Sequence, residues 1–216
     1  MKYLVEMSNI SHKFDTLLYE DIGFRLLGGE SIAILGASGS GKSTILNHLS
    51  TLLPPQQGTI HLTGYQNIYS LNEKDLLFLR QKILGIIFQA HYLFRGFNVM
   101  QNLQIAELIA HINIDMKMLE DFKIAHTLKQ QIGELSGGQQ QRLSIARVLT
   151  KQPKILLADE PTGNLDKDTA LSVMQYLLHY VKVNNAALVL ATHDQNLAHL
   201  CSMVVLLENK TLRQIQ

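Results

Sequence analysis

Short apolar runs alternate with longer amphipathic stretches along the chain, and this pattern predicts strands that are joined by crossover helices. The runs are almost continuously hydrophobic, which is typical of parallel strands that are buried on both faces of a sheet. We expect such strands at residues 31–35, 83–88, 155–157, 187–191 and 203–207. The predicted fold class is therefore α/β, with a mostly parallel core sheet.

Two parts of the chain depart from this pattern. The first 30 residues and residues 59–62 alternate between apolar and polar positions, which predicts a separate N-terminal antiparallel layer. Residues 99–129 lack a run of strand type and predict two helices, within a small helical subdomain at approximately 90–150. Because no repeat or linker divides the sequence, residues 1–216 are expected to form a single domain.

Composition narrows the class of protein. Only 17% of the residues are charged and the net charge is +1, which argues against a general nucleic-acid-binding protein. The longest purely apolar run is the six residues from Ala186 to Ala191, far short of the ~20 that span a bilayer. A single cysteine, Cys201, excludes an internal disulfide framework and fits a reducing compartment. We therefore expect a soluble, intracellular protein.

A glycine-rich loop follows the predicted strand at 31–35 and precedes an apolar helical pattern. The segment Gly36-Ala37-Ser38-Gly39-Ser40-Gly41-Lys42-Ser43-Thr44 has the spacing of a P-loop. Its glycines let backbone N–H groups turn toward phosphate oxygens, and the helix adds the positive end of its dipole. Lys42 is expected to bridge the β- and γ-phosphates of a nucleotide, and the Ser43 hydroxyl to ligate Mg²⁺. The alternative is a Gly/Ser-rich turn that matches by accident.

Three further predicted strands end in polar residues that belong at the same sheet edge. Asp159 is expected to hold Mg²⁺ through water, and Glu160 to face the attacking water. His193 can contact the γ-phosphate through a ring N–H, and Gln89 can reach Mg²⁺ or the water. Each has an alternative as a solvated strand end or a structural histidine, which the P-loop in the same chain disfavours.

A second anion-binding helix start is predicted at Ser136-Gly137-Gly138-Gln139, where Ser136 is a good N-cap. The following helix has an apolar face and should end before Pro153. One chain then carries two γ-phosphate binders that are far apart in sequence. The economical arrangement is a head-to-tail homodimer, in which each nucleotide lies between one P-loop and the partner's signature segment.

Taken together, these motifs resemble the ATP-binding cassette (ABC) family over essentially the full length of the chain. The P-loop, Gln89, the LSGGQQQR segment, LLADE, residues 164–166 and His193 occur in that family's order and spacing. The resemblance implies the ABC ATPase fold with ATP and Mg²⁺ bound. It also implies that Glu160 positions the water as base, that Gln89 links to membrane subunits and that residues 164–166 couple two sites. Phe14 falls where the family has an adenine-stacking aromatic ring, usually tyrosine.

Within the family, residues 71–89 and 158–166 are similar to those of lipoprotein-releasing (LolD-type), macrolide-export (MacB-type) and cell-division (FtsE-type) ATPases. We therefore expect an ATPase subunit, most like the lipoprotein-releasing type, that powers a separate integral membrane permease from the cytoplasmic face of the cell membrane. One alternative is a cell-division ATPase that regulates cell-wall remodelling. A second is a soluble ABC ATPase that acts on nucleic acid or ribosomes, although such relatives generally carry two cassettes or basic extensions.

Overall fold

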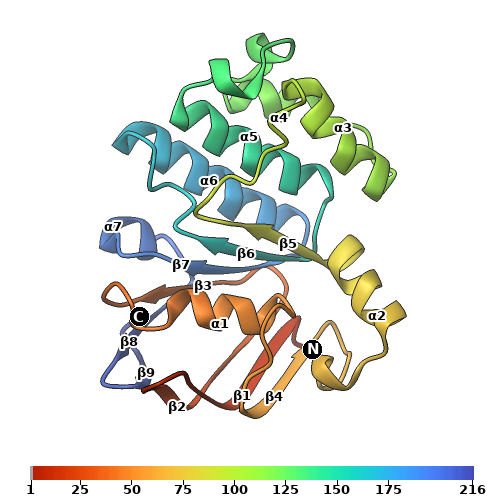
Figure 1. The fold of residues 1–216 in the computed structure, drawn as a ribbon. Coiled ribbons are helices and arrows are strands. Elements are labelled where there is room, and N and C mark those ends of the chain that lie inside the picture. Colours follow the sequence, from red (N-terminus) through yellow and green to blue (C-terminus); the bar gives the residue numbers. More distant parts are fainter. Residues whose placement is uncertain (1) are drawn as a thin grey trace.

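Within residues 2–216, which the computed structural model describes, a six-stranded sheet forms the centre of the molecule (Figure 1). Its spatial order is β5-β6-β7-β3-β8-β9, and only β9 runs antiparallel to its neighbour. The strands are β3 (Ser31–Leu35), β5 (Leu84–Ile87), β6 (Ile155–Asp159), β7 (Ala187–Ala191), β8 (Met203–Glu208) and β9 (Thr211–Gln214). The predicted, mostly parallel core sheet is confirmed.

Alternate residues of the central strands enter two different hydrophobic cores. On β3, Ala33 and Leu35 belong to the core formed with α5 (Gly137–Thr150) and α6 (Lys167–Val183). Ile32 and Ile34 point to the other face, toward α1 (Lys42–Leu49) and the second sheet. This two-residue period is inherent in a strand, and burial on both faces explains why the strand sequences are hydrophobic throughout.

The second sheet is antiparallel and has the order β2-β1-β4 in the described part of the chain. It is built from β1 (Val5–Lys13), β2 (Leu17–Leu26) and β4 (Gln57–Leu62), so the predicted N-terminal antiparallel layer is confirmed. Helix α1 lies between the two sheets (Figure 1). The loop that precedes α1 is therefore bounded by both layers.

Helices cover the far side of the central sheet (Figure 1). The region 99–129 contains α3 (Val99–Ala110) and α4 (Met116–Asp121), which confirms the two expected helices, and α3 packs on α5. A capping box at Asn98 and Gln101 begins α3. The remaining helical elements are α2 (Glu73–Phe78), α7 (Gln195–Ala198), the π-helical Leu79–Ile83 and the 3₁₀ turns Ile68–Ser70, Ala125–Thr127 and Ile132–Glu134.

Two details of the strand prediction are wrong. Ile83 belongs to the π-helical segment, so the strand expected at 83–88 is the shorter β5. Strand β9 was not predicted, because its sequence is short and mostly polar. Of the helices in residues 2–216, none is both long enough and apolar enough to cross a bilayer.

Candidate active site

A cavity of about 660 Å³ opens beyond the carboxyl ends of β3, β6 and β7. Ligands of open α/β sheets bind at this edge, because the loops after the strands converge there. Most of the residues singled out from the sequence lie on its walls. The lining consists of Phe14, Leu18, Ser38, Gly39, Gly41, Lys42, Ser43, Thr44, Gln89, Asp159, Glu160, Gly163, Asn164 and His193.

The glycine-rich loop connects β3 directly to α1, as predicted. Gly41, the N-cap of α1, has a φ of 106°, and a Cβ there would lie 2.9 Å from Cε1 of Tyr19. A larger residue is therefore excluded by both conformation and space. The N-terminus of α1 has no side-chain cap in the described structure, so its N–H groups are available to an anion in the cavity.

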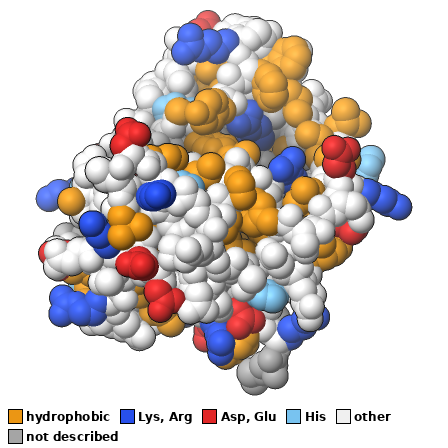
Figure 2. Space-filling view, turned by 60° about the horizontal axis from the view of Figure 1, so that its bottom comes forward, with side chains coloured by type: hydrophobic (Ala, Val, Ile, Leu, Met, Phe, Trp, Pro, Cys, Tyr) orange, Lys and Arg blue, Asp and Glu red, His pale blue; other side chains and the backbone are white. Residues whose placement is uncertain are grey.

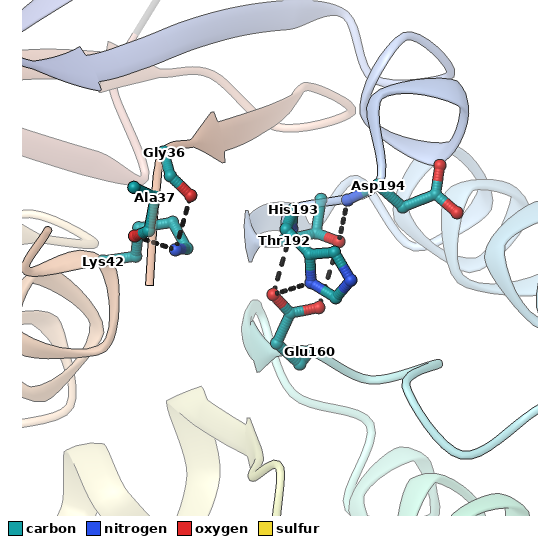
Figure 3. A network of polar contacts seen from close by, with 7 residues as sticks. All are labelled: Gly36, Ala37, Lys42, Glu160, Thr192, His193 and Asp194. Carbon is teal, nitrogen blue, oxygen red and sulfur yellow. Dashed lines mark hydrogen bonds and ion pairs between the residues drawn. The ribbon is translucent and has the colours of Figure 1, made fainter. Parts of the chain in front are cut away.

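Lys42 curls back over this loop (Figure 3). Its Nζ donates hydrogen bonds to the carbonyl oxygens of Gly36 at 2.8 Å and Ala37 at 2.9 Å, and the residue is 9% exposed. Both acceptors are uncharged, so the ammonium group keeps a positive charge within the loop. An anion that enters the cavity can neutralise that charge.

Two adjacent carboxylates end β6. Asp159 is the last residue of the strand, and burial raises the pKa of its carboxyl group. The Ser43 hydroxyl and the Lys42 charge act in the opposite direction on that pKa, while the Glu160 carboxylate raises it further. Glu160 has a φ of 45°, and its N–H donates to the Ala191 carbonyl at 2.9 Å. Glu160 thus leaves the strand conformation directly after β6, and its backbone is bonded to the end of β7.

Glu160 and His193 form a pair at the ends of neighbouring strands (Figure 3). Oε1 of Glu160 lies 2.8 Å from Nδ1 of His193 and also accepts the His193 backbone N–H at 3.0 Å. Oε2 accepts the Thr192 hydroxyl at 3.2 Å. The Glu160 side chain is 13% exposed and that of His193 is 75% exposed. Sequence reasoning placed both residues at one sheet edge but did not predict that they contact each other.

The Ser136 segment lies outside this cavity. Ser136 is exposed and forms a capping box at the start of α5: its Oγ accepts from Gln139 N at 3.2 Å, and its N–H donates to Gln139 Oε1 at 2.8 Å. Gly137 has open space around it, and a Cβ at Gly138 would lie 3.3 Å from Leu165. Of the other predicted nucleotide residues, Gly36 and Ser40 belong to the loop but not to the cavity wall among the described residues.

Two residues in or beside the site, Leu18 and His91, could not be identified from the sequence. Leu18 of β2 lines the cavity because the β1–β2 hairpin folds over the loop, which a local pattern does not reveal. His91, two residues after Gln89, places Nε2 3.3 Å from Nδ2 of Asn164. Its carbonyl oxygen accepts the Ser144 hydroxyl of α5 at 3.1 Å. The segment after β5 is thus joined to two other parts of the molecule.

Known proteins match both the sequence and this arrangement. The ABC transporter family matches residues 19–163. The chain is 36% identical to the lipoprotein-releasing system ATP-binding protein LolD of Treponema denticola, over 99% of both chains. It is 37% identical to the protein of that name from Ehrlichia canis, over 95% of both chains.

Among solved structures, the fold is similar to the dimeric structure of a post-hydrolysis state of the ATP-binding cassette MJ0796 bound to ADP and Pi. That similarity has a TM-score of 0.88 and 26% sequence identity, over 98% of both chains. The matched family region includes the P-loop, Gln89, the Ser136 segment and both carboxylates. The chain therefore belongs to the ABC transporter family and is an ATP-hydrolysing cassette.

Proposed function

We propose that the chain is the ATPase subunit of a membrane transporter of the lipoprotein-releasing type, and that the cavity beyond β3 is its Mg-ATP site. The observation that carries the proposal is the convergence of the P-loop, both carboxylates, Gln89 and His193 on one cavity. The lipoprotein-releasing role is carried over from the relatives named LolD.

The cavity has the chemistry that a nucleotide triphosphate requires. Lys42 and the N-terminus of α1 supply positive charge and N–H donors for the phosphates. Ser43, Gln89 and Asp159 bring a hydroxyl, an amide oxygen and a carboxylate to the same wall, and oxygen ligands of this kind suit Mg²⁺. The Mg²⁺ that arrives with ATP would be held by these three residues. Phe14, at the cavity edge, offers a ring face for adenine.

Glu160 is the group suited to accept the proton of an attacking water. Its two oxygens are oriented by the Thr192 hydroxyl and the His193 N–H, and 13% of the side chain remains exposed to the cavity side. His193 is mostly exposed, so its ring can turn from Glu160 to a γ-phosphate while Thr192 and the His193 backbone keep the carboxylate in place.

A second copy of the chain would complete the site. The Ser136 end of α5 is exposed and is absent from the wall of its own cavity in the described structure, although helix starts of this kind bind anions. In a head-to-tail dimer, Ser136, Gly137, Gly138 and Gln139 of each copy would contact the nucleotide in the other copy. The similarity to dimeric structures of the cassette MJ0796 supports this arrangement.

The membrane partner would dock beside the Gln89 segment. Large hydrophobic side chains are exposed on α2, on the segment after β5 and on α3, and Figure 2 shows hydrophobic side chains grouped on one face. The exposed hydrophobic side chains of these three segments are Leu77, Phe78, Tyr92, Phe94, Phe97, Leu108 and Ile109. Grouped exposed apolar side chains of this kind mark interaction surfaces.

We propose that the chain lies on the cytoplasmic face of the cell membrane. We also propose that residues 1–216 form one domain, with a helical subdomain at approximately 90–150.

The test combines hydrolysis with the identity of the partner. The purified chain should release phosphate from Mg-ATP, and Lys42→Ala should lose both ATP binding and hydrolysis while it keeps the wild-type circular dichroism spectrum. Affinity capture from detergent-solubilised membranes of the source cells should recover an integral membrane subunit, and depletion should mislocalise lipoproteins. Filamentous growth without lipoprotein mislocalisation would select the cell-division alternative. Recovery of RNA or DNA without a membrane protein would overturn the proposal.

A further inference from the structure

Three buried polar side chains meet beneath the antiparallel sheet, next to the nucleotide cavity. His12 of β1 is 5% exposed, while Tyr19 of β2 and His48 of α1 are fully buried. The ring centroids of His12 and His48 lie 4.8 Å apart at an interplanar angle of 63°, and those of Tyr19 and His48 lie 6.1 Å apart at 88°. The cluster therefore links the sheet to the helix that follows the P-loop.

Four polar atoms of this cluster lack a hydrogen-bond partner in the described structure. They are both ring nitrogens of His12, Nε2 of His48 and the hydroxyl of Tyr19. Burial of a polar atom without a partner is unfavourable, and an apolar ring of similar size would avoid that cost. An imidazole at position 12 thus costs stability compared with an apolar ring, and besides His48 it contacts a second ring on the side of the cavity.

That contact is with Phe14. The ring centroids of His12 and Phe14 lie 4.8 Å apart at an angle of 79°, which is an edge-to-face arrangement. Phe14 follows the end of β1 in the turn to β2, is 59% exposed, and lines the cavity. The His12 ring thus contacts both Phe14 and His48, and it connects the exposed Phe14 to the buried helix α1.

We propose that His12 is a positioning residue for the base of the nucleotide: its neutral ring holds Phe14 at the cavity wall, and protonation of His12 releases it. This inference rests on the proposed Mg-ATP site, and it adds a pH-dependent control of base stacking. The imidazole, unlike a phenyl ring, stops filling this apolar space once it carries a charge, because the imidazolium then requires water or an acceptor.

The surroundings keep the cluster neutral at pH 7. Burial lowers the pKa of His12 below its usual 6.5. Burial also lowers the pKa of His48, and a hydrogen bond from Nδ1 to the Leu53 carbonyl at 2.7 Å opposes that change. Tyr19 and Tyr69, which pack around the pair, have pKa values raised by burial and stay uncharged. Lys13, the next residue after His12, is exposed.

The direction of the pH effect follows from these shifts. Since the folded pKa of His12 is depressed, the neutral ring persists at pH 7 and is lost only below the usual value of 6.5. Affinity for a nucleotide with a base should then fall on the acid side. An edge-to-face pair contributes enough to change affinity about two- to tenfold.

The test compares Mg-ATP with Mg-tripolyphosphate, which has the phosphates but no base. Isothermal titration at pH 7.5 should show that His12→Ala binds Mg-ATP about two- to tenfold more weakly and tripolyphosphate as tightly as wild type. His12→Phe, which restores an apolar ring, should recover the ATP affinity. Met7→Ala is the matched control, because Met7 is a buried residue of the same strand with 1% exposure. It should leave both affinities within about twofold.

The pH profile separates positioning from packing. As the pH falls from 7.5 through the depressed pKa of His12, the ratio of the Mg-ATP affinity of His12→Phe to that of wild type should rise, since only wild type loses the Phe14 contact. Titration of ATP itself cancels in that ratio. Superimposable profiles of the two proteins would overturn the proposal even if His12→Ala failed to fold. Equal losses for ATP and tripolyphosphate would overturn it as well, whereas a folded wild type that binds neither ligand would overturn the proposed function instead.

Discussion

Replacement of Glu160 by glutamine tests the proposed chemistry with little structural change. The amide keeps an oxygen that can accept the His193 N–H at 3.0 Å and a ring N–H at 2.8 Å. The new NH₂ group would face the Thr192 hydroxyl, which lies 3.2 Å from the present Oε2 and has a free lone pair. Glu160→Gln should therefore fold like wild type, and the change removes the negative charge of the carboxylate together with its ability to accept a proton.

The expected effect is large on hydrolysis and small on binding. A positioned general base contributes about 10²- to 10⁴-fold to a rate, which corresponds to about 2.7–5.5 kcal/mol in the barrier. The groups proposed to bind the phosphates, Lys42 and the N-terminus of α1, are untouched. Mg-ATP should then remain bound, and the dimer held together by two nucleotides should accumulate.

Phosphate release at saturating Mg-ATP and light scattering during size exclusion measure the two effects. Glu120→Gln is the matched control, because Glu120 is an exposed glutamate of α4 that does not line the cavity. It should hydrolyse ATP at the wild-type rate. Wild-type turnover by Glu160→Gln would refute the assignment of Glu160 as base, and a slow variant that stays monomeric with ATP would refute the two-nucleotide dimer.

Three further predictions concern stability, the second binding element and the buried thiol. Leu157 is fully buried in β6, and Leu157→Ala should lower the free energy of unfolding in urea by about 2–5 kcal/mol. Replacement of the exposed Leu52 by alanine should change that free energy by less than about 0.5 kcal/mol. Ser136→Ala and Asp115→Ala each remove a helix N-cap and should each lower the free energy of unfolding by about 0.5–2 kcal/mol in the same assay. Only Ser136→Ala should abolish ATP-driven dimerisation, measured by size exclusion. If both variants dimerised, or neither did, Ser136 would have no specific role in binding the partner's nucleotide. Burial raises the pKa of Cys201 to about 11, so iodoacetamide at pH 8 should alkylate native protein about 10²-fold more slowly than urea-unfolded protein; equal rates would contradict burial.

The central strands and the site edge were predictable because each is encoded locally. Residues 187–191 are hydrophobic at every position, and burial on both faces of a parallel sheet is the structural reason. Strand β6 ends at Asp159 and pairs with Ala191, the last residue of β7. Polar residues that follow such strands must gather at one edge, so Glu160 and His193 could be placed together from sequence order alone.

Other features depend on contacts that no local pattern encodes. The apolar run from Ile83 fits either a strand or a helix, and the bond from Lys154 N to the Ile83 carbonyl forms only in the folded chain. Strand β9 pairs with β8 through a turn at Asn209 and Lys210, both with positive φ, where the usual glycine is missing. In the sequence, nothing distinguishes His12 from the other histidines without an assigned role, because only the tertiary structure places its ring against Phe14.

The loop 160–166 gives a physical reason why two sites of a dimer would act together. It is closed by a bond from Gly163 N to the Glu160 carbonyl at 3.2 Å and another from Leu165 N to the Thr162 carbonyl at 3.0 Å. A Cβ at Gly138 would lie only 3.3 Å from Leu165, so the start of α5 packs directly on this loop. In the proposed dimer, a nucleotide bound by one copy would contact Ser136 of the other. Any displacement of α5 would then be transmitted through the packed loop to Glu160, and the base of one site would respond to occupancy of the other.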